Sequence, residues 1–140
     1  AVAQYAYPLD AVAQKPSPES GYVVNGISSI LSLNENQLLV LERSFSTGNI
    51  SLVVKIYLTN LTGAENIRDN ESILLSPVKK SLTKKLIFDF SSLKITIDNL
   101  EGICFGPRLP NGNRSLLVIA DNNFNPLEQT QLFLFDSGIK

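Results

Sequence analysis

The chain has 140 residues, the length of one domain, and it is 44% hydrophobic and 18% charged, so it can bury a core. Its formal net charge is -1 and no stripe of Lys and Arg runs through it, which argues against a nucleic-acid partner or an anionic membrane surface. No apolar run approaches the ~20 residues that a membrane helix needs, so we predict no membrane span.

The sequence contains no histidine, which removes Ser-His and Cys-His nucleophile pairs and imidazole metal ligands. Ser28 and Ser44 therefore have no imidazole to activate them. Cys104 is the single cysteine, and its apolar neighbours predict a small core residue rather than a reactive thiol. The chain contains no methionine and does not begin like a signal peptide, so we expect it to be processed or to be a piece of a longer protein.

The first element expected is a short strand over Gln4–Leu9, in which two tyrosines and a leucine share one face at period two. Pro8 makes it an edge strand or ends it. The segment Gln14–Gly21 contains Pro, Ser and Gly, and it predicts a loop.

The rest of the chain predicts short strands separated by turns. The run Leu38–Leu41 is apolar at every position, which is typical of a strand covered on both faces. Phe88–Leu93 reads as a strand end or a single helical turn. Because long periodic helical segments are missing, the pattern predicts an all-β architecture. The expected strands are Val23–Leu33, Gln37–Phe45, Ile50–Leu61, Leu86–Phe90, Gly102–Phe105, Leu116–Ala120 and Gln131–Phe135.

Four lysines, Lys79, Lys80, Lys84 and Lys85, cluster just before the expected strand at Leu86. A solvated face is the ordinary interpretation of such a cluster. A phosphate-binding patch is the alternative.

Two parts of the chain resemble each other, Gly26–Phe45 and Gly102–Phe124. Each begins with a Gly-Ile strand and continues through a turn into an apolar strand that ends in an acid, two polar residues and Phe. Anchored on the phenylalanines, Asp121 pairs with Glu42. A repeated unit of antiparallel strands is typical of propeller blades, so we predict about two antiparallel β-propeller-like blades, with a compact sandwich as the alternative.

The repeat also predicts how the chain is divided. Residues 1–22 would hold the outer strand of a preceding blade and a linker, residues 23–98 the first blade, and residues 99–140 the second. Stable propellers have about 4–8 blades, so two blades do not close a ring. We therefore expect this to be part of a larger propeller, completed by the remainder of that propeller or by other chains.

The stretch Asn99–Phe124 reads NLEGICFGPRLPNGNRSLLVIADNNF and is followed by TQLFLF. Together with Tyr5–Asp10, Gly26–Ser28 and Leu38–Phe45, it resembles the phytase-like family, which is named for an esterase-like activity of phytase. The resemblance covers most of the chain and is looser over residues 62–85. It implies an exported bacterial β-propeller, periplasmic or extracellular, with esterase-like or phytase-like hydrolysis.

Glu101 is the leading candidate for chemistry. It precedes Gly102 at the start of an expected inner strand, where glycine allows a close approach of the backbone. In calcium-containing propeller lactonases and esterases, a Glu before a Gly at this place is similar. The alternative is that Glu101 caps or bridges loops.

A metal site is predicted from oxygen-bearing side chains, because hard cations such as Ca²⁺ prefer carboxylate and amide oxygens. The predicted ligands are Glu101, Asp121, Glu42 and Asn122, and Asn99 offers a further amide oxygen. The alternative for the run Asp121 to Asn123 is ordinary turn chemistry.

The guanidinium of Arg43 can hold a phosphate or a carboxylate through two hydrogen bonds, although an internal ion pair is the alternative. The predicted catalytic residues are therefore Glu101, Asp121 and Arg43. They would serve a hydrolase of phosphate or carboxylic esters, assisted by Ca²⁺, with a small-molecule ester as its partner. A non-catalytic propeller used for binding is the main alternative, and an oligomerising β domain without activity is another.

Overall fold

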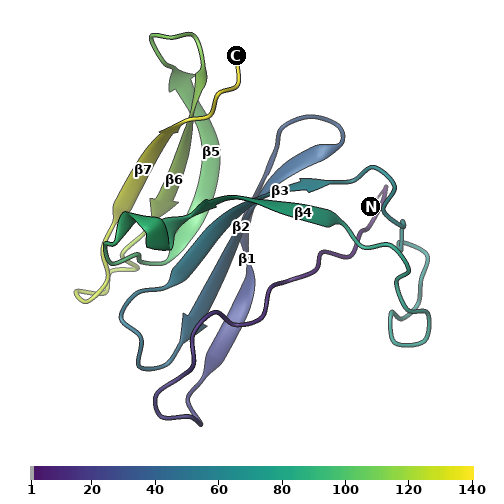
Figure 1. Ribbon diagram of the computed structural model, residues 1–140, viewed down its shortest axis with the longest axis horizontal. Helices are drawn as coiled ribbons and strands as arrows, with labels where there is room; N and C mark the ends of the chain where they lie inside the picture. Colours follow the sequence, from purple (N-terminus) through teal and green to yellow (C-terminus); the bar gives the residue numbers. More distant parts are fainter. Residues whose placement is uncertain (1) are drawn as a thin grey trace.

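The structure, a computed structural model, describes residues 2–140. It consists of seven strands in two antiparallel sheets, joined by the single-turn 3₁₀ helix η1 (Phe90–Leu93) (Figure 1). The all-β prediction is confirmed, and these two sheets do not close into a ring. Within residues 2–140, no helix is both long and apolar enough to cross a membrane. In order, the first sheet contains β1 (Val23–Ser32), β2 (Gln37–Ser46), β3 (Val53–Asn60) and β4 (Thr83–Asp89), and the second contains β5 (Leu100–Arg108), β6 (Arg114–Ala120) and β7 (Gln131–Asp136).

The hydrophobic core lies between the two sheets. Successive side chains of a strand point to opposite faces, so Leu39 and Leu41 of β2 face the core while Val40 faces the other way. All three are buried, which confirms that this apolar run is covered on both faces. Phe90 of η1 is fully buried and makes edge-to-face contacts with the ring of Phe133 at 5.1 Å between centroids. The helical turn predicted near the end of β4 therefore anchors one sheet on the other.

The N-terminal segment crosses the face of the first sheet that points away from the core, as the purple trace in Figure 1 shows. The strand predicted over Gln4–Leu9 is wrong, because the segment forms no ladder with another strand. Its backbone carbonyls instead accept isolated hydrogen bonds, Gln4 from Ile67 and Ala6 from Leu82, both at 2.9 Å. The loop prediction for Gln14–Gly21 is confirmed.

The register of the strands corrects the alignment of the internal repeat. Gly26 pairs with Arg43 across β1 and β2, and Gly102 pairs with Ile119 across β5 and β6. The position that corresponds to Glu42 is therefore the fully buried Val118, and not Asp121, which follows the end of β6. Anchoring on the phenylalanines was wrong because Phe45 lies within β2, whereas Phe124 lies in a turn. The division into blades at residues 22 and 98 stays a prediction.

Cys104 is exposed, so its assignment to the core is wrong. The cause is the alternation of β5, in which Ile103 faces the core and the next side chain faces outward. The outward face of the second sheet also exposes apolar side chains, among them Ile119, Leu132 and Leu134.

Candidate functional site

Two adjacent residues of β2, Glu42 and Arg43, mark two different polar sites. Because they are neighbours in a strand, their side chains project from opposite faces of the first sheet. Glu42 points toward the N-terminal segment, and Arg43 points toward the second sheet. We call the group around Glu42 the closed cluster and the group around Arg43 the open cluster.

The closed cluster consists of Tyr7, Asp10, Glu42, Tyr57 and Lys84. The ammonium of Lys84 lies 2.6 Å from Asp10 Oδ1 and 2.9 Å from Glu42 Oε2. It also lies 4.3 Å from the centre of the Tyr57 ring, in a cation–π contact. The hydroxyl of Tyr7 donates to Glu42 at 3.0 Å, and that of Tyr57 donates to Asp10. Every charged group of the cluster therefore has an opposite charge beside it.

The pKa values of the two carboxyl groups follow from these contacts. Hydrogen bonds from Lys84 and then Tyr57 lower the pKa of Asp10 to about 2. Burial of Glu42 acts to raise its pKa, but hydrogen bonds from Lys84 and Asn25 outweigh the burial and lower it. Both carboxylates are thus held charged.

The other members of the closed cluster are also held in their ordinary protonation states. Burial acts to lower the pKa of Lys84, but hydrogen bonds to Asp10 and Glu42 outweigh it and raise the pKa. Burial, followed by hydrogen bonds to the carboxylates, raises the pKa of Tyr7 and of Tyr57. Neither Lys84 nor the tyrosines are therefore poised to act as a base at neutral pH.

Space in the closed cluster is also limited. The cavity beside Asp10, Asn25 and Glu42 has a volume of about 10 Å³, which is the room that one water molecule needs. The cluster attaches the N-terminal segment to the first sheet, since Asp10 N also donates to Glu42 Oε1 at 2.8 Å. The prediction of a solvated lysine face is therefore wrong for Lys84. It agrees with the exposure of Lys79, Lys80 and Lys85.

The open cluster consists of Arg43, Asn99 and Glu101. Arg43 Nη1 lies 3.3 Å from Glu101 Oε1, with side chains that are 29% and 49% exposed. Asn99 Nδ2 donates to the same carboxylate oxygen at 2.5 Å. Asn99 Oδ1 is buried and accepts no hydrogen bond from any residue in the range 2–140. Unlike the closed cluster, this group retains an unused acceptor.

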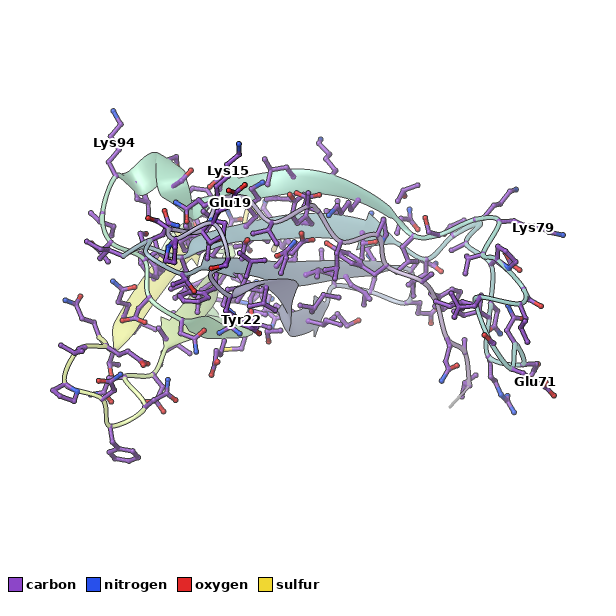
Figure 2. All side chains as sticks on the ribbon, turned by 90° about the horizontal axis from the view of Figure 1, so that it is seen from below. Lys15, Glu19, Tyr22, Glu71, Lys79 and Lys94 are labelled. Carbon is purple, nitrogen blue, oxygen red and sulfur yellow. The ribbon has the colours of Figure 1, made fainter. Side chains whose placement is uncertain are left out.

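Arg43 and Asn99 of the open cluster line a pocket of about 630 Å³ at the junction between the two sheets. One wall is apolar and includes Tyr22 and Phe45, whose ring centroids are 6.2 Å apart. Figure 2 labels Tyr22 at the edge of the first sheet. The polar lining includes Asn123 and Glu128 from the loop that joins β6 and β7. A pocket of this size suits a small organic molecule.

Asp121 and Asn122 follow β6 at the end of the second sheet where β5 begins, because Leu100 pairs with Ala120. Asp121 Oδ1 accepts from the backbone N–H of Asn123 at 2.9 Å, and Asn122 Oδ1 accepts from that of Phe124 at 3.3 Å. Both side chains therefore perform the turn chemistry that was the alternative at this position.

The predicted metal ligands are not brought together. Glu42 contacts Lys84 on one face of the first sheet, Glu101 contacts Arg43 on the other, and Asp121 and Asn122 bond to their own turn. Within residues 2–140 there is no group of three or more acidic or cysteine side chains placed to hold a metal ion. The residues thus do not fit a shared calcium site, and calcium binding by the separate groups stays a prediction.

The comparison with protein families adds to this geometry. A family model for phytase-like proteins, described as "Esterase-like activity of phytase", matches residues 1–124. The chain belongs to the phytase-like family. Searches of the curated proteins and of the solved structures found no match. Membership of the phytase-like family indicates a hydrolase-like function of the esterase or phytase type at the level of the family.

Sequence reasoning missed most of the closed cluster in this phytase-like chain. It identified Glu42 but not its partners Asp10 and Lys84, which lie far from it in the sequence. One signal was available, because Tyr7 and Asp10 belong to the short motif Tyr5–Asp10 on which the family resemblance rests. In the structure, this motif is the segment that covers Glu42 and bonds to it through Tyr7 and Asp10.

Proposed function

We propose that this phytase-like chain carries a hydrolase site for phosphate or carboxylic esters in the pocket beside the open cluster. The observation that supports the proposal is the Glu101 carboxylate, which is half exposed and paired with Arg43, a residue that lines a cavity of about 630 Å³. A carboxylate and a guanidinium side by side offer a base and an anion-stabilising group to the same substrate.

In this proposal, Glu101 accepts a proton from a water molecule while the water oxygen bonds to the ester carbon or phosphorus. Arg43 donates hydrogen bonds to the negative charge that develops on the substrate oxygen. When the bond to the leaving oxygen breaks, the alcohol leaves with a proton from Glu101. Asn99 positions the Glu101 carboxylate, because its Nδ2 donates a hydrogen bond to Glu101 Oε1. Asp121 orders the turn that carries Asn123 into the pocket wall.

The test is the hydrolysis of 4-nitrophenyl esters by the Glu101→Gln variant. Gln keeps the size and the hydrogen bonding but cannot accept the proton, so we expect kcat to fall by about 100-fold. Glu35→Gln is the matched control, because Glu35 is exposed in the turn between β1 and β2. Equal rates for the Glu101→Gln variant and the unmodified protein would overturn the proposal.

A non-catalytic binding module is the second candidate function. The observation in its favour is that Glu101 Oε1 already accepts hydrogen bonds from Arg43 and Asn99, so this oxygen is held in a structural contact. If the protein binds small organic acids but turns over no carboxylic or phosphate ester, the binding module is the better description.

Two finer features belong to the same proposal. Calcium would assist hydrolysis through oxygen ligands at Glu101 or Asp121, and no step described above depends on it. Export to the periplasm or the extracellular space is proposed from family membership.

A further inference from the structure

We infer that the pocket beside the open cluster binds an apolar organic acid, or the ester of one, and rejects polyphosphorylated substrates. The inference rests on the proposed function and narrows its substrate class. It follows from the charge of the pocket lining, from the character of its walls and from the atoms that remain available for a ligand.

Charge is the first argument. Within the described range 2–140, Arg43 is the one cationic side chain that lines the pocket, whereas Asp98 and Glu128 are acidic and line it too. Glu101 adds a further carboxylate against Arg43. A substrate with several phosphate groups requires several Arg or Lys side chains to offset its charge, and here it would meet more negative than positive charge. A single carboxylate requires only one guanidinium.

The apolar wall is the second argument. The apolar residues that line the cavity are Tyr22, Phe45, Ile50, Leu52 and Leu127. Of these, Ile50 is 88% exposed and Leu127 is 90% exposed, so both have most of their surface available to a ligand. An aliphatic or aromatic body would remove this surface from water, whereas an inositol ring carrying phosphates would not.

At the polar end of the pocket, Arg43 keeps hydrogen-bond donors available for a ligand. Arg43 uses Nη1 for Glu101, and within residues 2–140 no protein acceptor bonds to its Nε or Nη2. Those two donors can hold one carboxylate through parallel hydrogen bonds. Asn99, whose side chain holds the partner carboxylate Glu101, lines the same pocket. The pocket thus pairs one anion site with one apolar wall.

Binding measurements without turnover provide the test. We expect saturation-transfer NMR to detect binding of 4-phenylbutyrate, and no binding of inositol hexakisphosphate at the same concentration. The uncharged 4-phenylbutanol should bind about 10-fold more weakly than 4-phenylbutyrate, because it lacks a charge-assisted hydrogen bond. Tighter binding of inositol hexakisphosphate than of 4-phenylbutyrate would overturn the inference.

Variants at Arg43 identify the anchor. Arg43→Met should weaken 4-phenylbutyrate binding at least about 10-fold, while Arg43→Lys should weaken it less because it keeps the charge but loses the two-point contact. Arg68→Met is the matched control, since Arg68 is exposed in the long connection between β3 and β4. Unchanged binding of 4-phenylbutyrate to a fully folded Arg43→Met variant would overturn the inference.

Hydrolysis assays on the same proteins separate this inference from the proposed function. If 4-phenylbutyrate binds in an Arg43-dependent way but no ester is hydrolysed, the inference stands and the proposed function fails. If phosphate is released from inositol hexakisphosphate in a Glu101-dependent way, the proposed function stands and the inference fails. Hydrolysis of 4-nitrophenyl butyrate, without release of phosphate from inositol hexakisphosphate, supports both the proposed function and the inference.

Discussion

The closed and open clusters begin at adjacent residues of β2 and differ in how completely their charges are paired. Glu42 is 3% exposed and is surrounded by Lys84, Asn25, Tyr7 and the backbone of Asp10. Arg43, one residue further, meets a single carboxylate and borders a cavity. Adjacent positions in the same strand therefore have different roles, and a charged residue in a strand is not by itself evidence of a site.

The degree of charge pairing shows which cluster is available for chemistry. Burying a charge has a large free-energy cost unless it is paired and hydrogen-bonded, so a saturated group such as Lys84 with its carboxylates holds the fold together. A group that keeps free donors and acceptors at a pocket can bind a ligand. The following predictions test this division.

The largest effect is expected for Lys84→Met. The substitution leaves the carboxylates of Asp10 and Glu42 close together without their shared cation, so the free energy of unfolding should fall by about 3–5 kcal/mol. Chemical denaturation measures it. Lys85→Met, at the exposed neighbouring position, should change the same quantity by less than about 0.5 kcal/mol. Equal stability of the two variants would show that the closed cluster does not hold the N-terminal segment.

Acid should destabilise the protein through the same cluster. The pKa of Asp10 is lowered from 3.8 to about 2 in the folded state, so its charged form contributes stability above about pH 4. That contribution is lost as the pH falls through about 2, and the depressed pKa of Glu42 acts in the same direction. The unfolding midpoint should therefore drop over this range, and the drop should be shallower in the Lys84→Met variant. A similar pH dependence in both proteins would contradict the assignment.

A smaller effect on stability is expected for Arg43→Met. Its ion pair with Glu101 is 29% and 49% exposed, and such pairs contribute about 0–1 kcal/mol. The free energy of unfolding should change within that range, although ligand binding weakens. A loss as large as that of Lys84→Met would mean that the open cluster is structural too.

Calcium should have the smallest effect, because the predicted ligands do not share one site. At a Ca²⁺ concentration equal to the dissociation constant, binding would add about 0.4 kcal/mol of stability. The thermal midpoint with and without Ca²⁺ measures this. A rise that Glu101→Gln or Asp121→Asn abolishes would support the calcium prediction, and a rise that depends on Glu42 would contradict the separation of the clusters.

Much of the fold could be predicted from the sequence, because period-two alternation and turn residues are local signals. They predict β2 and β7 within one residue at each end, and β6 within two. The strand expected over Gln4–Leu9 failed because alternation reports which face is covered, and a segment laid across a sheet alternates as a strand does. The outward position of Cys104 could not be predicted, because the phase of alternation is not visible in a run that is apolar at most positions.

The candidate site could be predicted only in part. Family resemblance and the Glu-Gly step indicated Glu101, and strand alternation separates Arg43 from Glu42. The contact of Arg43 with Glu101 joins residues 58 positions apart, and it depends on how the two sheets pack. Single-sequence patterns do not contain that information. For the same reason, Lys84 could not be distinguished from its exposed neighbours Lys79, Lys80 and Lys85.

The central claim is that the open cluster is the ligand site and that the closed cluster is structural. Amide chemical-shift changes during a titration with 4-phenylbutyrate test it most directly, because they report every position at once. We predict the largest changes at Arg43, Asn99 and Asn123, and changes near zero at Asp10 and Tyr57. Largest changes at Asp10 and Tyr57, or on the outward face of β6 at Ile119, would contradict the account.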